Sequence, residues 1–392
     1  NPNAEKFKKI QKDRNMNEDW NGVSIMRNDR EVFFGYPHPW TGGLDLNQPR
    51  GRWIGFEISF NAVHDKSFVV KNAMHYFTLL KDKKNILDHE ERKKIILNNL
   101  KTIFAKSKCE NNPDLSLVEE VTNLVEYPTA LKGKFSEDFL ALPEELLNLT
   151  MKQHQRYFPM RSIDEGKIIN QFITISNNKD EKKLIIEGNE RVLQARLADA
   201  KFFWDKNKKQ NLVKLVSKLN GIVFYKDLGT VYDKTQRVRQ LSSLIADIIV
   251  CNKEDTEIAA SICKADLVTD LVGEYPELQG VIGSYFALGQ GFSPEISKAI
   301  SDHYLPLGPN DRVPKEKIAI CVAIADKLDT LIGFFGINVK PTSSKDPFAL
   351  RRAVLGIIRI LIENKISISL KEIINNSKNL YLSNNIKFTN DK

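Results

Sequence analysis

Four residues near the middle of the sequence, Lys152, His154, Arg156 and Tyr157, have the types and spacing to bind a polyanion. If this segment is helical, Lys152 and Arg156 are i, i+4 neighbours whose two cations suit adjacent phosphates. Tyr157 or Phe158 then stacks on a base or ribose. The alternative is an ion-pairing surface with both aromatic rings in the core. His154 has no visible partner that would make it a general base.

The surrounding charge supports a nucleic-acid surface. Residues 151–220 contain 15 Lys and Arg against 8 Asp and Glu, a surplus of 7, whereas the whole chain has 58 against 50, a surplus of 8. A local basic surplus with aromatic residues beside it is typical of such a surface. Lysines scattered by chance would give the same surplus, so charge alone leaves both interpretations open.

Three carboxylates, Asp266, Asp326 and Asp329, stand in otherwise apolar helical segments. Such a carboxylate destabilises the fold unless it is paired or binds a metal. The pattern resembles the HD-type metal phosphohydrolase fold, in which a His-Asp pair and a later Asp hold a divalent metal. In this sequence Lys264 and an alanine precede Asp266 where that pair would be needed.

No histidine occurs between His154 and His303. A borderline metal is held poorly without imidazole ligands. We therefore predict a degenerate HD-like domain with no metal, whose carboxylates pair with Lys264, Lys327 or arginines of the last helix.

A third candidate cluster consists of the cations Lys345, Arg351 and Arg352. They surround the start of a helix that we expect to begin at Asp346 and Pro347. Cations in a first helical turn oppose the helix dipole unless an anion lies nearby. That anion is either an RNA phosphate or an internal carboxylate such as Asp329.

The elements that must position these residues follow from apolar periodicity. We expect helices at 90–100, 115–125 and 142–158, a β-branched strand at 168–177, and mainly helices afterwards. In the segment 188–204, Leu193, Leu197, Ala200 and Trp204 form one buried stripe. Arg191 and Arg196 lie off that stripe and are available to a partner.

Several classes of site are missing from the sequence. The phosphate-binding patterns GxGxxG and GxxxxGK[ST] do not occur, and the four cysteines form no CxxC pair, which favours buried free thiols. No apolar run reaches the ~20 residues that a membrane helix needs, and the first residues lack the apolar core of a signal peptide. We therefore expect a cytoplasmic protein that does not bind a membrane. We also expect no DNA partner.

The amino-acid sequence of several segments resembles that of the β subunit of the bacterial heterotetrameric glycyl-tRNA synthetase. The resemblance covers roughly residues 90–370, in order and at family-like spacing, and is carried by the segments 142–160, 188–204, 263–283, 323–337 and 340–360. It implies a chain that lacks the family's N-terminal part and its C-terminal anticodon-binding domain.

The resemblance also implies a function. The β subunit binds tRNA-Gly, while the α subunit of an α2β2 tetramer holds ATP, Mg²⁺ and glycine. This chain then binds no cofactor and contributes no catalytic residue. Two other functions stay open: an HD-type metal-dependent phosphohydrolase and a non-catalytic tRNA-binding scaffold.

The expected fold class is α+β and predominantly helical. A mixed α/β RNA-contacting region is followed by an all-helical degenerate HD-like domain. The expected segments are an irregular stretch at 1–55, a mixed basic region at 56–220, the HD-like domain at 221–340, and a helix opening a further domain at 341–392.

Overall fold

The computed structural model describes residues 85–342, 345–384, 386, 388 and 389, together with residues 24, 25, 57, 58, 74, 75 and 78. Almost all of the segment predicted as irregular, 1–55, lies outside the described residues. The chain divides into two units, residues 1–197 and 198–392. Each unit is considered by itself.

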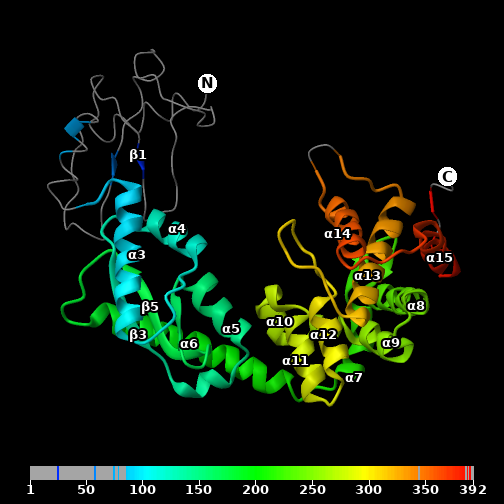
Figure 1. Cartoon of the computed structure of the whole chain (residues 1–392), viewed down its shortest axis with the longest axis horizontal. Coiled ribbons are helices and arrows are strands. Elements are labelled where there is room, and N and C mark those ends of the chain that lie inside the picture. Colours follow the sequence, from blue (N-terminus) through cyan, green and yellow to red (C-terminus); the bar gives the residue numbers. More distant parts are fainter. Residues whose placement is uncertain are drawn as a thin grey trace, which may run out of the picture. The chain divides into compact units, whose positions relative to one another are not determined.

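The first unit is built around a small antiparallel sheet. Strands β3 (Thr129–Lys134), β5 (Ile168–Ser176) and β4 (Phe158–Arg161) lie in the order β3-β5-β4. Helices α3 (His89–Lys106) and α4 (Leu115–Leu124) pack against each other (Figure 1). They contribute buried apolar residues to a core shared with β4 and β5. The helices expected at 90–100 and 115–125 and the strand expected at 168–177 are confirmed.

The prediction of a single helix over residues 142–158 is wrong. A 3₁₀ turn (Glu137–Ala141) leads into α5 (Glu144–Asn148), and a π-helical turn, η3, covers Leu149–His154. Arg156 then adopts a left-handed backbone with φ of 58°, and β4 starts at Phe158. Pro159 favours the extended conformation of Phe158, because a proline disfavours the α conformation of the residue before it.

Helix α6 (Leu184–Asn207) has the predicted buried stripe. Leu193, Leu197 and Ala200 are fully buried, and Trp204 is half-buried against the rings of Tyr285 and Phe286.

Among its described residues, the second unit is helical apart from one short hairpin, β6 (Val223–Tyr225) and β7 (Gly229–Thr230). Helix α13 (Lys317–Gly336) is buried along most of its length and packs against α8, α9, α12, α14 and α15 (Figure 1). The α-helices of this unit are α7 (Leu212–Val216), α8 (Val231–Ile249), α9 (Lys253–Ile262), α10 (Asp270–Glu274), α11 (Val281–Gly289), α12 (Pro294–Asp302), α13, α14 (Leu350–Glu363) and α15 (Leu370–Ser383). Short 3₁₀ helices occur at Ser217–Gly221, Ala265–Val268 and Pro276–Leu278.

The protein is therefore α+β and predominantly helical, as the sequence predicted. One boundary differs. Helix α14 begins at Leu350, and not at Asp346 and Pro347. Asp346 still caps this helix, because its carboxylate accepts hydrogen bonds from the backbone N–H groups of Leu350 (2.9 Å) and Arg351 (3.0 Å).

Candidate nucleic-acid interface

The two cations of the first candidate cluster do not share a helix face. Lys152 lies in η3, whereas Arg156 follows its end. Lys152 Nζ lies 3.2 Å from a carboxylate oxygen of Asp114, and Arg156 Nε lies 2.7 Å from a carboxylate oxygen of Glu120. Both cations are thus paired within the protein. His154 ends η3 and is exposed.

Asp114 has a second role besides pairing with Lys152. Its carboxylate caps α4 by accepting hydrogen bonds from the backbone N–H groups of Ser116 (3.1 Å) and Leu117 (3.3 Å). Burial opposes its ionisation, but the Leu117 N–H group and Lys152 outweigh burial and lower its pKa. A phosphate that took Lys152 from Asp114 would leave the cap intact. The loss would be one surface ion pair, worth about 0–1 kcal/mol.

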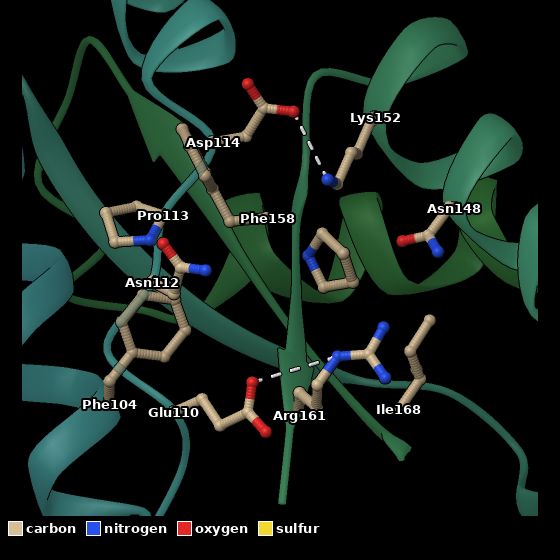
Figure 2. A pocket seen from close by; sticks show the side chains of 11 residues that line it. Phe104, Glu110, Asn112, Pro113, Asp114, Asn148, Lys152, Phe158, Arg161 and Ile168 are labelled. Atoms are coloured by element: carbon tan, nitrogen blue, oxygen red, sulfur yellow. Dashed lines mark hydrogen bonds and ion pairs between the residues drawn. The ribbon is translucent and has the colours of Figure 1, made fainter. Parts of the chain in front are cut away.

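Lys152 lines a polar pocket of about 200 Å³ in the first unit. Figure 2 shows Asp114 and Lys152 on one side of it, and Arg161 with Glu110 on another. Arg161 lies 4.0 Å from Glu110 and donates a 3.2 Å hydrogen bond to Glu144. The pocket therefore presents two cations, each held in place by a carboxylate.

Tyr157 and Phe158 are buried, with 4% and 2% of their surfaces exposed. The Tyr157 ring stacks on Phe172 at a centroid distance of 4.7 Å, and its hydroxyl donates a 2.5 Å hydrogen bond to Asn189. Burial raises the pKa of Tyr157 to about 12. The expectation that one of these rings stacks on a base is wrong in this conformation. Both rings belong to the core, as the alternative interpretation had it.

Arg191 and Arg196 are positioned by the contacts of α6 with β3. The carboxylate of Glu190 accepts a hydrogen bond from the backbone N–H of Lys134 (2.8 Å), and the amide oxygen of Gln194 accepts one from Ser136 (3.3 Å). With that face fixed, Arg191 and Arg196 are exposed. Within the described part of the chain, neither has an ion-pair partner.

Lys345, Arg351 and Arg352 are exposed near the start of α14. The Arg351 guanidinium donates a hydrogen bond to the carbonyl of Thr342. None of the three forms an ion pair with a described residue. The internal carboxylate considered for them, Asp329, has other partners.

Those partners form the buried charge cluster, which we define as Lys234, Arg237, Lys264, Asp326 and Asp329. Arg237 Nε lies 2.8 Å from Asp329, while Lys234 lies 3.2 Å from Asp326 and 3.4 Å from Asp329. Lys264 lies 3.1 Å from Asp326. The predicted pairing with Lys264 is confirmed.

The prediction that Lys327 or arginines of the last helix pair with these carboxylates is wrong. Lys327 donates to the backbone carbonyls of Tyr304 (2.9 Å) and Leu305 (2.8 Å), and burial lowers its pKa to about 8. The arginine of the cluster comes from α8 and not from the last helix. The sequence could have indicated that Lys234 is buried, because Lys234 shares the i, i+4, i+7 apolar stripe of α8 with Val238 and Leu241.

Asp266 lies apart from the cations. One carboxylate oxygen accepts hydrogen bonds from the backbone N–H groups of Gly280 (2.6 Å) and Gly283 (2.9 Å), while the other is buried without a hydrogen-bond partner. A β-carbon on Gly283 would lie 3.0 Å from this carboxylate, so the close approach favours glycine. Burial raises the pKa of Asp266 to about 6.

Asp326 has the opposite pKa shift. Burial disfavours its ionisation, but Lys234 and Lys264 outweigh burial and lower its pKa.

The described residues contain no group of three or more His, Cys, Asp or Glu side chains that could hold a metal ion. In that same part of the chain, no helix combines the length and apolar composition that crossing a membrane requires.

Comparison with known proteins identifies the family. Residues 57–391 match the model of the glycyl-tRNA synthetase beta subunit family. The chain belongs to this family.

Its curated relatives are named glycine--tRNA ligase beta subunit. The protein of Phenylobacterium zucineum is 44% identical over 312 residues, which is 78% of this chain and 47% of the relative. That of Listeria monocytogenes is 41% identical over 351 residues, covering 88% of this chain and 49% of the relative. That of Coxiella burnetii is 42% identical over 320 residues, covering 81% and 46%. The chain thus spans about half the length of these relatives.

Proposed function

We propose that this chain acts as the β subunit of a glycine–tRNA ligase. It binds tRNA-Gly and positions its 3′ end, to which glycine is transferred after activation with ATP and Mg²⁺ on a partner α subunit. The observation that carries this proposal is the family match over residues 57–391. An α2β2 assembly and a cytoplasmic location belong to the same proposal.

The structure supports a role in positioning. Arg191, Arg196, Arg351 and Arg352 are exposed, and within the described residues no carboxylate neutralises them. Such cations are available to phosphates, and phosphate binding releases counterions from the RNA. Lys152 and Arg156 join this set if phosphate displaces their carboxylates. The catalytic gain is then the orientation of the acceptor end and not a proton transfer by this chain.

We further propose that residues 221–340 form a degenerate HD-like domain. Alanine directly precedes Asp266, where a His-Asp pair requires a histidine, and the ammonium group of the neighbouring Lys264 lies against Asp326. Lys234 lies against the same carboxylate. Two ammonium groups thus lie against the same carboxylate oxygen of Asp326 and would repel a divalent metal there, which supports a structural role for the domain. Nothing in the comparisons supports a phosphohydrolase.

The test is a salt titration of binding to tRNA-Gly and to a non-cognate tRNA, with and without the α subunit. Phosphate contacts predict a linear fall of log K with log salt concentration, at a slope of about −0.7 to −0.9 per contact. We expect tighter binding to tRNA-Gly and a further gain with the α subunit. Aminoacylation by the α subunit should rise when this chain is added.

Two results would contradict the proposal. Binding that ignores both tRNA identity and the α subunit would favour a scaffold that contacts RNA non-specifically. Metal-dependent hydrolysis of a phosphate ester by this chain would favour the phosphohydrolase.

A further inference from the structure

Two of the four cysteines lie close together in the second unit. The sulfur atoms of Cys251 and Cys321 are 3.6 Å apart, and no disulfide joins any of the four cysteines. Cys109, Cys263 and Cys321 are buried, whereas Cys251 is partly exposed. The prediction of buried free thiols therefore holds for three of them. Cys251 differs because reagents in solution can reach it.

The fold brings these two sulfurs together from distant parts of the chain. Helix α8 ends at Ile249, and its C-cap Val250 adopts a left-handed backbone with φ of 53° that turns the chain towards α9. Cys251 follows at this corner, and its backbone N–H donates a 3.0 Å hydrogen bond to Ala246. Cys321 lies in the second turn of α13. The contact thus joins the corner between α8 and α9 to the helix at the centre of the unit.

The surroundings make the two sulfurs chemically unequal. The hydroxyl oxygen of Thr256 lies 3.4 Å from the Cys251 sulfur, and Lys317 donates a 3.0 Å hydrogen bond to the carbonyl of Val250 beside it. The Cys321 thiol first, and then Thr256 and Lys317, lower the pKa of Cys251 to about 6 against the effect of burial. Contact with Cys251 and burial raise the pKa of Cys321. These surroundings favour the thiolate on the accessible Cys251 and the thiol on the buried Cys321.

We propose that Cys251 and Cys321 form a reversible disulfide, in which Cys251 is oxidised first and Cys321 resolves the product. With a peroxide as the oxidant, the Cys251 thiolate attacks one peroxide oxygen and the O–O bond breaks. Cys251 becomes a sulfenic acid, and the leaving hydroxide takes a proton to become water. The Cys321 sulfur then attacks the Cys251 sulfur. The S–S bond forms, the S–O bond breaks, and the second hydroxide leaves as water with the Cys321 proton.

This sequence balances, since two thiols lose two electrons and one peroxide becomes two waters. The two sulfur atoms already lie in contact, 3.6 Å apart. A disulfide bond is about 2.05 Å long, so the sulfurs approach each other by about 1.5 Å. The product would tie residue 251 to residue 321 and so restrict the separation of α8 and α9 from α13. A small dithiol would reverse it by exchange.

The test uses the reduced chain, a few equivalents of hydrogen peroxide, and iodoacetamide to cap the remaining thiols before digestion without reductant. We expect the first product to be a linked peptide pair containing Cys251 and Cys321, lighter by two hydrogens, that dithiothreitol separates. In the untreated folded chain, Cys251 should react with iodoacetamide about tenfold faster than Cys109 or Cys263, because it is the accessible thiolate.

Variants assign the roles of the two sulfurs. In Cys321→Ser, the sulfenic acid on Cys251 should persist and be trapped by dimedone, whereas Cys251→Ser should leave Cys321 unmodified. Cys263→Ser, which also removes a buried thiol, should leave the linkage unchanged. The proposal is overturned if both thiols of the original chain are still capped by iodoacetamide after excess peroxide. It is also overturned if Cys251 links to a second molecule instead of Cys321.

Discussion

The buried charge cluster of the second unit and the exposed arginines of α6 and α14 contain the same kinds of side chain in opposite surroundings. Arg237 is fully buried and bound by Asp329, with Tyr381 also hydrogen-bonded to that carboxylate at 3.0 Å. Arg191 and Arg352 are exposed and, within the described residues, have no carboxylate partner. The first arrangement is required by the fold, because a buried charge must be paired.

This difference separates the cations that hold the chain together from those available to another molecule. Counting Lys and Arg does not make that separation, because Lys234 and Lys264 contribute to the net charge of the chain and yet face inward. A surface that binds RNA should lose affinity and little stability when its cations are removed. The buried cluster should show the reverse. Four predictions test this contrast.

The largest effect is expected for Asp329→Ala. The substitution leaves Arg237 buried without its counter-ion, and such a loss costs about 3–5 kcal/mol of the free energy of unfolding. Urea denaturation measures it. The control is Asp205→Ala, which also frees two cations, Lys201 and Lys208, but at the surface. There we expect a loss of about 0–1 kcal/mol. Equal losses for the two variants would show that burial does not distinguish these pairs.

Asp266→Asn should change the pH dependence of stability. The pKa of Asp266 is raised from 3.8 to about 6 in the folded chain, so the folded state holds a proton that the unfolded state has lost. Its contribution to stability is present below about pH 4 and is lost as the pH rises to about 6. A shift of this size corresponds to roughly 3 kcal/mol, at 1.36 kcal/mol per unit. The variant lacks this loss, so its stability relative to the original chain should rise over that window.

Asp326→Asn is the matched control and should behave in the opposite way. Lys234 and Lys264 lower the pKa of Asp326, so its contribution is present at neutral pH and is lost as the pH falls through the acid range. The variant should be less stable than the original chain at neutral pH. Parallel stability curves for Asp266→Asn and the original chain between about pH 4 and 6 would contradict the assignment for Asp266.

How much of this could be predicted from the sequence depends on whether a residue's partner is local. The strand at Ile168–Ser176 and the buried stripe of α6 followed from periodicity, which is a local property. The pairing of Asp326 with Lys264 was also predicted, because a carboxylate in an apolar helix needs a cation. That Asp329 takes its arginine from α8 depends on tertiary packing across 92 residues, which spacing does not reveal.

The candidate interface was predicted less well for the same reason. The i, i+4 argument for Lys152 and Arg156 assumed a regular helix, but a π-helical turn and the left-handed backbone of Arg156 interrupt it. Tyr157 is a residue type that can stack on a base, but its ring stacks on Phe172 in the core. Composition located the basic region, while exposure and pairing decide which of its members are available.

Replacing both Arg191 and Arg196 with Ala should weaken tRNA binding by about tenfold and reduce the salt slope by about 2, roughly 1 for each phosphate contact removed. Filter binding over a range of salt concentrations measures both quantities. The control removes two cations that are already paired, Arg239 with Glu257 and Lys253 with Asp247. If the control lowers the slope as much, net charge alone accounts for binding and α6 has no special role.

The smallest effect on stability, and the sharpest test of the contrast, is expected for Arg352→Glu. Arg352 lies in the first turn of α14, where a cation opposes the helix dipole and an anion favours it. The substitution should therefore stabilise the chain by about 0.5–1 kcal/mol. It should at the same time weaken tRNA binding, because a negative charge replaces a proposed phosphate contact.

Arg352→Gln, which removes the cation without adding an anion, should show about half of each change. Urea denaturation and tRNA binding on the same preparations give both quantities. A loss of stability in Arg352→Glu would indicate a carboxylate partner for Arg352 within the protein and would move it to the structural class. A gain in stability together with weaker tRNA binding would instead show that Arg352 destabilises the start of α14 and contacts an external anion. A structural cation cannot produce that combination.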